Sequence, residues 1–204
     1  NPRLGLIWSP VDTTALKFLY GTAFRAPNAF ELYYVSTGSQ KANPTLKPEK
    51  IRSYEFVIEH QLQPDFRITA DAYNNKVSNN INQITDPVDG LMVFINAGQV
   101  DSHGVEFEAE RLWDSGTRLK ASYAWQISRE KASGAELVNS PRQLAKLNFS
   151  MPLPWDALRT GMEFQYTGSR KTLAGATANG HLLTNLTLLS EKSVKGLELA
   201  ASIY

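Results

Sequence analysis

The sequence predicts an all-β fold, an antiparallel meander of about 10 to 11 strands that is one part of a larger wall. Apolar and polar residues alternate in short runs along the whole chain, which is the period of a strand and not of a helix. Short turns rich in Pro, Asp, Gly and Ser alternate in strict order with long connections. Both observations indicate a series of hairpins.

The predicted strands follow one another with the apolar residues of each on one face. Their approximate bounds are 3–8, 14–24, 51–60, 66–75, 91–98, 104–112, 117–128, 143–151, 158–166, 181–189 and 196–204. The fifth and sixth runs form a single strand if the chain is merely interrupted near Asp101 and Ser102, which lowers the count from about 11 to about 10.

The connections indicate how the strands are arranged. The short turns are SPVD, QLQPD, WDSG, PLPWDA and SEKSV, and the long segments are 25–50, 76–90, 129–142 and 167–180. Short turns at one end and long loops at the other are typical of an outer-membrane β-barrel, whose tilted strands need roughly 9 to 11 residues to cross the bilayer. Greek-key sandwiches require crossovers instead.

Charged residues repeatedly share one face of the predicted strands. In the stretch GVEFEAE, for example, three glutamates alternate with Val105, Phe107 and Ala109. An Arg or Lys on the lipid face near mid-bilayer costs roughly 2 to 4 kcal/mol, so we expect the charged face to line a hydrated lumen. The predicted lumen-facing residues are Glu55, Arg67, Asp71, Glu106, Glu108, Glu110, Arg118 and Lys120. Arg67, Arg118 and Lys120 can then lie across from the glutamates.

Tryptophans are expected at the membrane–water interfaces of such a barrel. Trp8, Trp113 and Trp155 fall near short turns, and Trp125 lies toward a long-loop end. This placement predicts one aromatic belt at each end of the strands.

Composition and spacing argue against several other functions. The net charge of +1 gives no basic footprint for nucleic acid, and the absence of cysteine excludes disulfides and thiolate chemistry. Asp101, Ser102 and His103 are consecutive, and neighbours on a strand point to opposite faces, so they cannot form a catalytic triad. A metal site between His103 and Glu106 requires a bulge. We therefore predict no enzyme, no metal site and no cofactor, and expect His60 to lie at an interface.

Four motifs resemble the C-terminal barrel of TonB-dependent outer-membrane receptors. They are FRAPNAFELYY followed by NPTLKPEKIRSYEF, then NAGQVDSHGVEFEAE, SPRQLAKLNFSM and FQYTGSR. They follow one another in the order of the family and cover essentially the whole chain. The resemblance implies a barrel of about 22 strands around a plug, located in the outer membrane of a Gram-negative bacterium. It also implies substrate docking on the extracellular loops and energy supplied by TonB through the plug.

The same resemblance defines what residues 1–204 would be. They correspond to a partial C-terminal half of the barrel, with the plug domain and the last strands outside this sequence. The mapping places the segment 25–50 outside the cell and Trp8, Trp113 and Trp155 at the periplasmic rim.

The segment 25–50 also supplies the candidate substrate-binding residues, Arg25, Tyr33, Tyr34, Gln40 and Lys41. Cationic and aromatic groups suit an anionic, planar metal chelate such as a ferric siderophore. Haem is disfavoured because the histidine that haem importers of this family carry between the two motifs is missing. Two alternatives stay open, a different outer-membrane barrel (a porin or a surface enzyme) and a soluble β-sandwich binding module.

Overall fold

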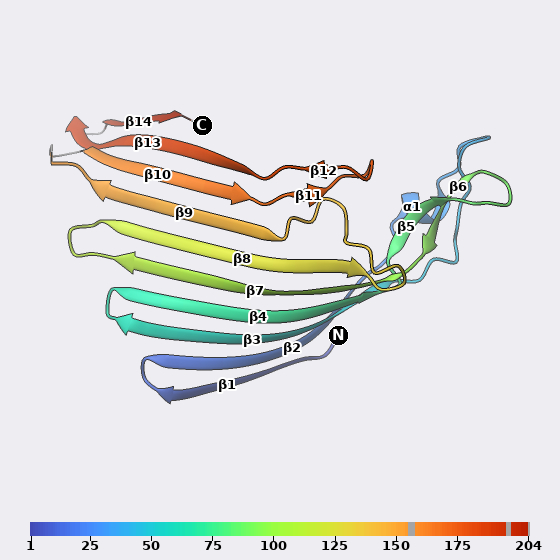
Figure 1. Cartoon of the computed structure of the whole chain (residues 1–204), viewed down its shortest axis with the longest axis horizontal. Coiled ribbons are helices and arrows are strands. Elements are labelled where there is room, and N and C mark those ends of the chain that lie inside the picture. Colours follow the sequence, from blue (N-terminus) through green and yellow to red (C-terminus); the bar gives the residue numbers. More distant parts are fainter. Residues whose placement is uncertain (155–157, 195–196, 204) are drawn as a thin grey trace.

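The chain folds into one large antiparallel sheet with excursions at one end. A computed structural model describes residues 1–154, 158–194 and 197–203. Ten strands form the sheet in the order β1-β2-β3-β4-β7-β8-β9-β10-β13-β14. Every neighbouring pair is antiparallel, and each strand pairs with the next one of the sheet along the chain (Figure 1). The predicted meander is therefore confirmed.

Except for β14, the described strands of the sheet have nine residues or more, which is long enough to cross a bilayer at a tilt. They are β1 (Arg3–Val11), β2 (Thr14–Arg25), β3 (Glu49–Gln63), β4 (Phe66–Ser78), β7 (Gln99–Leu112), β8 (Arg118–Glu130), β9 (Gln143–Pro152), β10 (Leu158–Thr167), β13 (His181–Val194) and β14 (Leu197–Ile203). The remaining elements are α1 (Ala29–Tyr33), β5 (Ile81–Thr85), β6 (Met92–Asn96), β11 (Arg170–Lys171) and β12 (Thr177–Ala178). No helix in the described part of the chain is long and apolar enough to cross a membrane.

Short and long connections separate cleanly to the two ends of the sheet. Figure 1 shows the tight turns together at one end and every long connection at the other. The long connections are 26–48, 79–98, 131–142 and 168–180. The alternation in the sequence thus predicted the arrangement correctly, and we call the two ends the short-turn end and the long-loop end.

One predicted strand is not part of the ten-stranded sheet, which we call the wall. The run 91–98 forms β6, which pairs with β5 in a separate two-stranded sheet at the long-loop end. Strand β7 then runs without a break through Asp101 and Ser102, where an interruption was expected. The chain changes direction at Gly98 instead, whose φ of 87° is open to glycine and costly for other residues. Because the run 91–98 pairs outside the wall, the wall has ten strands and not eleven.

The two faces of the sheet differ in character, as the alternation predicted. One face carries large apolar side chains that nothing in the described structure covers, with Leu6 65% exposed and Phe107 53% exposed. We call it the apolar face, and the opposite one the polar face. A soluble sandwich would bury the apolar face under a second sheet. All ten long strands belong to one sheet, so the β-sandwich alternative is wrong.

The tryptophans lie close to the ends of the sheet where the sequence placed them. Trp8 precedes the turn between β1 and β2, and Trp113 follows β7 directly, both at the short-turn end. Trp125 lies opposite Gln143, the first residue of β9, toward the long-loop end. Trp155 lies outside the described residues.

Candidate functional site

Two long connections at the long-loop end pack into one structure, which we call the loop unit (residues 26–48 and 79–98). The amide of Lys41 donates to the carbonyl of Met92 at 3.0 Å, and the amide of Met92 donates to the carbonyl of Ser39 at 2.9 Å. The side chain of Asn43 donates to the carbonyl of Phe94 at 2.9 Å. The first loop thus lies along the edge of the β5–β6 hairpin.

Apolar burial supports the same packing. Leu46 from the first loop is 9% exposed, and Ile81 and Val93 from the hairpin are 9% and 6% exposed. These are among the most buried apolar residues of the described chain, whereas the wall buries few. The loop unit therefore has a small core of its own, which keeps its shape defined.

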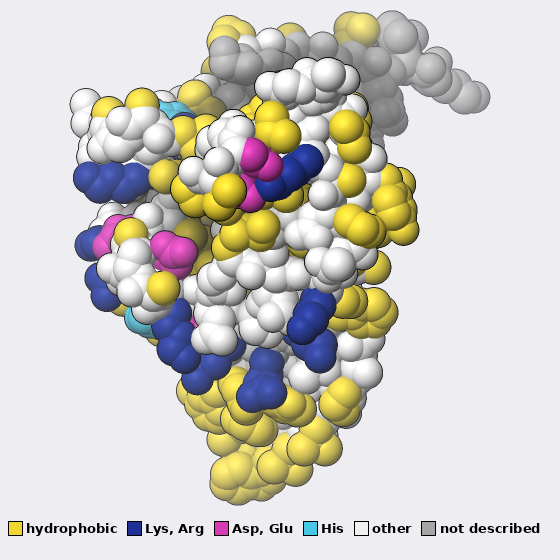
Figure 2. All heavy atoms as spheres, turned by 90° about the vertical axis from the view of Figure 1, so that its right-hand side faces the viewer, with side chains coloured by type: hydrophobic (Ala, Val, Ile, Leu, Met, Phe, Trp, Pro, Cys, Tyr) yellow, Lys and Arg dark blue, Asp and Glu magenta, His cyan; other side chains and the backbone are white. Residues whose placement is uncertain are grey.

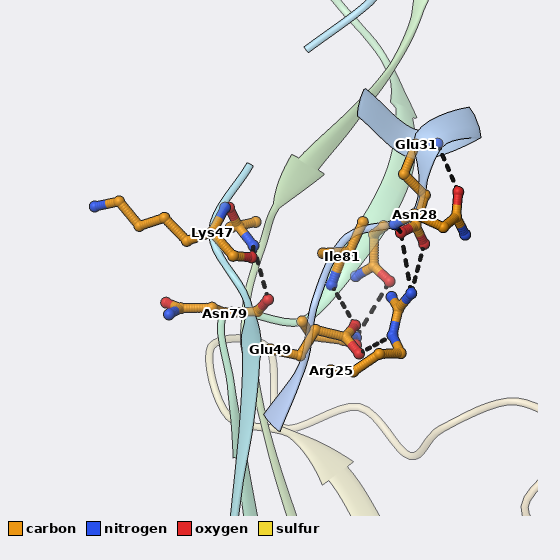
Figure 3. A network of polar contacts seen from close by, with 10 residues as sticks. Arg25, Asn28, Glu31, Lys47, Glu49, Asn79 and Ile81 are labelled. Carbon is orange, nitrogen blue, oxygen red and sulfur yellow. Dashed lines mark hydrogen bonds and ion pairs between the residues drawn. The ribbon is translucent and has the colours of Figure 1, made fainter. Parts of the chain in front are cut away.

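A network of ion pairs closes the base of the loop unit (Figure 3). Arg25, the last residue of β2, donates through Nε to Glu49 Oε2 at 2.5 Å and through Nη1 to Glu31 Oε1 at 2.9 Å. Glu49, the first residue of β3, accepts the amide of Ile81 at 2.7 Å. The three charges thus join β2, β3, α1 and the β5–β6 hairpin. We call this network the base clasp.

The short helix α1 begins with a capping box that contributes to the base clasp. Asn28 Oδ1 accepts the amide of Glu31, and Glu31 Oε2 accepts the amide of Asn28 at 2.8 Å. This reciprocal arrangement fixes the helix start and orients the Glu31 carboxylate. Arg25 then meets a carboxylate that is already in position.

A second ion-pair cluster lies farther out in the loop unit. Lys41 Nζ contacts Asp86 Oδ2 at 2.5 Å and Asp89 Oδ2 at 2.7 Å. These hydrogen bonds lower the pKa of both carboxyls below the ordinary value of 3.8 and raise the pKa of Lys41 above 10.5. The cluster is therefore fully charged at neutral pH.

Several aromatic residues of the loop unit are exposed to solvent. Tyr33 is 63% exposed and Tyr34 is 43% exposed. Phe30 stacks on Tyr34 with ring centroids 4.3 Å apart and meets Phe94 edge-on at 5.9 Å. The aromatic group is thus supported from the hairpin and still open to a ligand.

The structure separates the five predicted substrate-binding residues into two groups. Arg25 and Lys41 are engaged in ion pairs within the loop unit. Gln40 is 5% exposed, and its Oε1 accepts a hydrogen bond from Gln83 at 3.0 Å. Tyr33 and Tyr34 face outward.

Sequence reasoning missed the acidic partners of these residues and the whole contribution of the hairpin. The missed residues are Glu31, Glu49, Asp86, Asp89 and Phe94. Lys41 is separated from Asp86 by 45 positions in the sequence, and no local pattern indicates such a pair.

The eight charged residues predicted for the lumen share one face of the sheet, the polar face. The register places Asp71 opposite Glu106, and Glu110 opposite both Arg67 and Lys120. Arg67 and Arg118 form ion pairs with Glu110, and Lys120 Nζ lies 3.0 Å from Glu108 Oε2. The expected pairing of cations with the glutamates is confirmed.

His60 and His103 contact neighbouring side chains of the sheet. Ser102 hydrogen-bonds Ser128 at 2.6 Å across the polar face, while His103 lies on the apolar face with its ring centroid 6.2 Å from that of Trp125. The register of β7 is regular at 102–104, without the bulge that a metal site would need. His60 Nδ1 lies 2.8 Å from Thr14 Oγ1.

A long-stranded meander with one uncovered apolar face, tight turns at one end and packed loops at the other defines the wall of a transmembrane β-barrel. The family description "TonB dependent receptor-like, beta-barrel" matches residues 1–204, and the chain belongs to this family. Such barrels are outer-membrane proteins of Gram-negative bacteria, and they are receptors and transporters, not enzymes.

Individual relatives agree with this assignment. The vitamin B12 transporter BtuB of Vibrio vulnificus is 30% identical over 204 residues, which are 98% of this chain and 31% of that protein. Among solved structures, a mutant of the ferric enterobactin receptor PfeA of Pseudomonas aeruginosa in complex with enterobactin matches with a TM-score of 0.82, at 19% identity, over 98% of this chain and 34% of that one. The iron transporter FrpB of Neisseria meningitidis matches with a TM-score of 0.75, at 14% identity, over 98% and 34%. The chain thus spans about a third of the length of these relatives.

Proposed function

We propose that the chain forms part of an outer-membrane importer for a scarce nutrient that arrives as a metal chelate, with a ferric siderophore as its substrate. The import would be energised by TonB through a plug domain outside these residues. The observation that carries the proposal is the loop unit, a preorganised platform with exposed aromatic rings at the long-loop end. Rigid aromatic surfaces favour flat, partly apolar ligands.

Within this proposal the five candidate residues have different roles. Tyr33 and Tyr34 contact the chelate, because both are exposed and Tyr34 stacks on Phe30. Arg25, Gln40 and Lys41 position the platform through their contacts with Glu49, Gln83 and Asp86. The polar face, with the paired charges along β4, β7 and β8, would line the lumen and face the plug, and the apolar face would contact lipid.

A corrinoid is the second candidate substrate, favoured by the identity of 30% with a vitamin B12 transporter. It is also a metal chelate with a large planar ring. Both ligand classes suit an aromatic platform, so the experiment must separate them.

The test uses a strain that lacks the full-length receptor, complemented with wild type or variants. Growth under iron limitation on a panel of ferric catecholate and hydroxamate chelates tests the first candidate, and cobalamin-dependent growth tests the second. We expect Tyr33→Ala combined with Tyr34→Ala to reduce uptake of the correct chelate roughly tenfold, from the loss of about 0.5–1.5 kcal/mol of stacking per ring.

The control is Val88→Ala, since Val88 is 90% exposed on the neighbouring turn and outside the aromatic group. If the receptor takes up a corrinoid and none of the iron chelates, the substrate is a corrinoid and not a ferric siderophore. Equal uptake by the double variant and wild type would show that the aromatic platform is not part of the binding site.

A further inference from the structure

The apolar face changes character row by row toward the long-loop end. The register aligns residues of β2, β3, β4, β7 and β8 into rows that cross the sheet. The last apolar row consists of Phe18, Phe56, Ala72, Val105 and Trp125. The next row consists of Tyr20, Tyr54, Asn74, His103 and Ile127. The following row consists of Thr22, Arg52, Lys76, Asp101 and Arg129. The face therefore passes from apolar through amphipathic to cationic.

Four cations of this region form what we call the basic patch, namely Lys50, Arg52, Lys76 and Lys131. All four are exposed. Together with Asp101 they line a cavity of about 580 Å³. Within the described residues none of the four has an ion-pair partner at 4.0 Å or less. Figure 2, which looks onto the long-loop end, shows Lys and Arg side chains gathered there, with hydrophobic side chains below them.

The neighbouring charges leave the basic patch strongly positive. Arg129, in the same row, is paired with Glu136 at 3.5 Å. Asp101 is the one acidic residue among those that line the cavity in the described chain. On the polar face of β4, β7 and β8, by contrast, the cations Arg67, Arg118 and Lys120 all have carboxylate partners. Pairing with carboxylates of the described chain therefore does not explain the cations of the basic patch, which lie on the apolar side of the sheet.

Their depth matches the headgroup layer of a bilayer. Four residues separate the Phe18 row from the Thr22 row on each strand, which is about 13 Å along the strand. Because the Phe18 row is the last apolar row, we take it as the edge of the hydrocarbon. At a tilt near 45° the Thr22 row then lies roughly 9 Å farther along the membrane normal, at headgroup level. This step rests on the assignment of the apolar face to lipid under the proposed function.

We propose that the basic patch binds the phosphorylated headgroup of an outer-leaflet lipid. Lys and Arg side chains at headgroup depth attract anionic lipid, and basic pockets between membrane segments hold phosphate-bearing headgroups. The Tyr20 and Tyr54 rings, 5.1 Å apart, lie one row deeper, where the glycerol or sugar part of the lipid meets the acyl chains. The acyl chains then extend over the Phe18 row.

The test measures lipid binding to the full-length receptor by native mass spectrometry. The protein is reconstituted in nanodiscs of phosphatidylcholine with a minor fraction of phosphatidic acid, whose headgroup is a phosphomonoester. We expect phosphatidic acid to be retained over phosphatidylcholine by wild type. At about fivefold per cation, Lys50→Gln, Arg52→Gln and Lys76→Gln together weaken its binding roughly a hundredfold, and Lys76→Gln alone weakens it about fivefold.

The matched control replaces three other exposed lysines, Lys47→Gln, Lys146→Gln and Lys171→Gln, and should retain wild-type binding. Inorganic phosphate at equal concentration should not displace the lipid. Equal binding by the patch and control variants would overturn the proposal, as would displacement by inorganic phosphate. If the triple variant fails to assemble, the single variant Lys76→Gln decides. We expect the triple variant to lose lipid binding and to keep normal chelate uptake. This result would show that the lipid site is distinct from the transport function.

Discussion

Gly104 in β7 shows how a single residue sets the packing of three strands. A Cβ atom added there would lie 2.6 Å from the carbonyl oxygen of Trp125 and 2.7 Å from the Tyr73 hydroxyl. The absence of a side chain lets the Tyr73 ring cross the strand, and its hydroxyl donates to Gln126 Oε1 at 3.1 Å. Gln126 in turn donates to the carbonyl of Pro141 in the loop 131–142. One glycine thus permits a contact from β4 to that loop.

We predict that Gly104→Ala destabilises the folded barrel by about 1 to 3 kcal/mol, because the backbone of β8 cannot move away without breaking the ladder. Gly161→Ala is the control, since a Cβ at Gly161 meets its nearest neighbour at 4.0 Å. Urea unfolding of the full-length protein in detergent measures both. Similar midpoints for the two variants would refute the steric role of Gly104.

The orientation of the faces can be tested at Phe107 and Glu108, which are neighbours on β7 and point to opposite sides. We predict that Phe107→Arg impairs membrane assembly far more than Glu108→Gln, because an arginine on the lipid face costs roughly 2 to 4 kcal/mol near mid-bilayer. Heat-modifiable mobility on gels reports the assembled fraction. Equal effects of the two changes would show that the assignment of lipid and lumen is wrong.

At the scale of elements, the loop unit depends on charges that join segments distant in sequence. Asp86 and Asp89 have lowered pKa values, so their contribution is present above the ordinary value of 3.8 and is lost as pH falls through their folded values. Lys41 has a raised pKa, so its contribution is present below 10.5 and is lost as pH rises beyond its folded value. Between these limits the cluster holds the two loops together.

We predict that Lys41→Gln increases amide hydrogen exchange in 79–98 a few-fold at pH 7, a modest effect because the pairs are largely solvated. Lys47→Gln is the control, because the side chain of Lys47 points away from its partners in the network (Figure 3). After correction for intrinsic exchange rates, the difference between wild type and Lys41→Gln should shrink as the pH falls through the lowered pKa values of Asp86 and Asp89. A difference that does not change with pH would show that the ion pairs are not its cause.

The strands of the wall could be predicted from the sequence, whereas the structure of the loop unit could not. Alternation alone fixes which residues share a face, and it placed Glu108 and Glu110 on the same face as their cationic partners Lys120, Arg67 and Arg118. Alternation is equally strong in Val93 and Ile95 of the β5–β6 hairpin, which pairs outside the wall. An alternating pattern does not indicate which sheet a strand joins. For the β5–β6 hairpin, this depends on residues distant in sequence, such as Asn43 and Lys41, which contact Phe94 and Asp86.

At the scale of the whole molecule, the sheet is an open arc with β1 and β14 at its edges (Figure 1). Both edges present unpaired backbone groups, and the apolar face is uncovered within the described residues. In the family, a barrel closes such edges and lipid covers such a face. The relatives are about three times as long, which leaves room for the remaining strands.

We predict that residues 1–204 produced alone aggregate in water and require detergent to remain dispersed. The reason is the combination of two exposed strand edges with a continuous apolar face. Size-exclusion chromatography with light scattering, with and without detergent, measures this. A monodisperse monomer in plain buffer would contradict a lipid-facing wall.

The base clasp has a consequence for how new ligand preferences can arise. The pairing of β2 with β3 runs unbroken to Arg25 and Glu49, and the ion pair between these two residues, which lie outside the loop, holds the chain at that point. Residues 26–48 are therefore an insertion between two fixed anchors. A graft of another length between these anchors leaves every inward and outward side chain of the wall in place. Under the proposed function, the loop that contacts the ligand can therefore change in length and sequence while the strands that lie in the membrane stay the same.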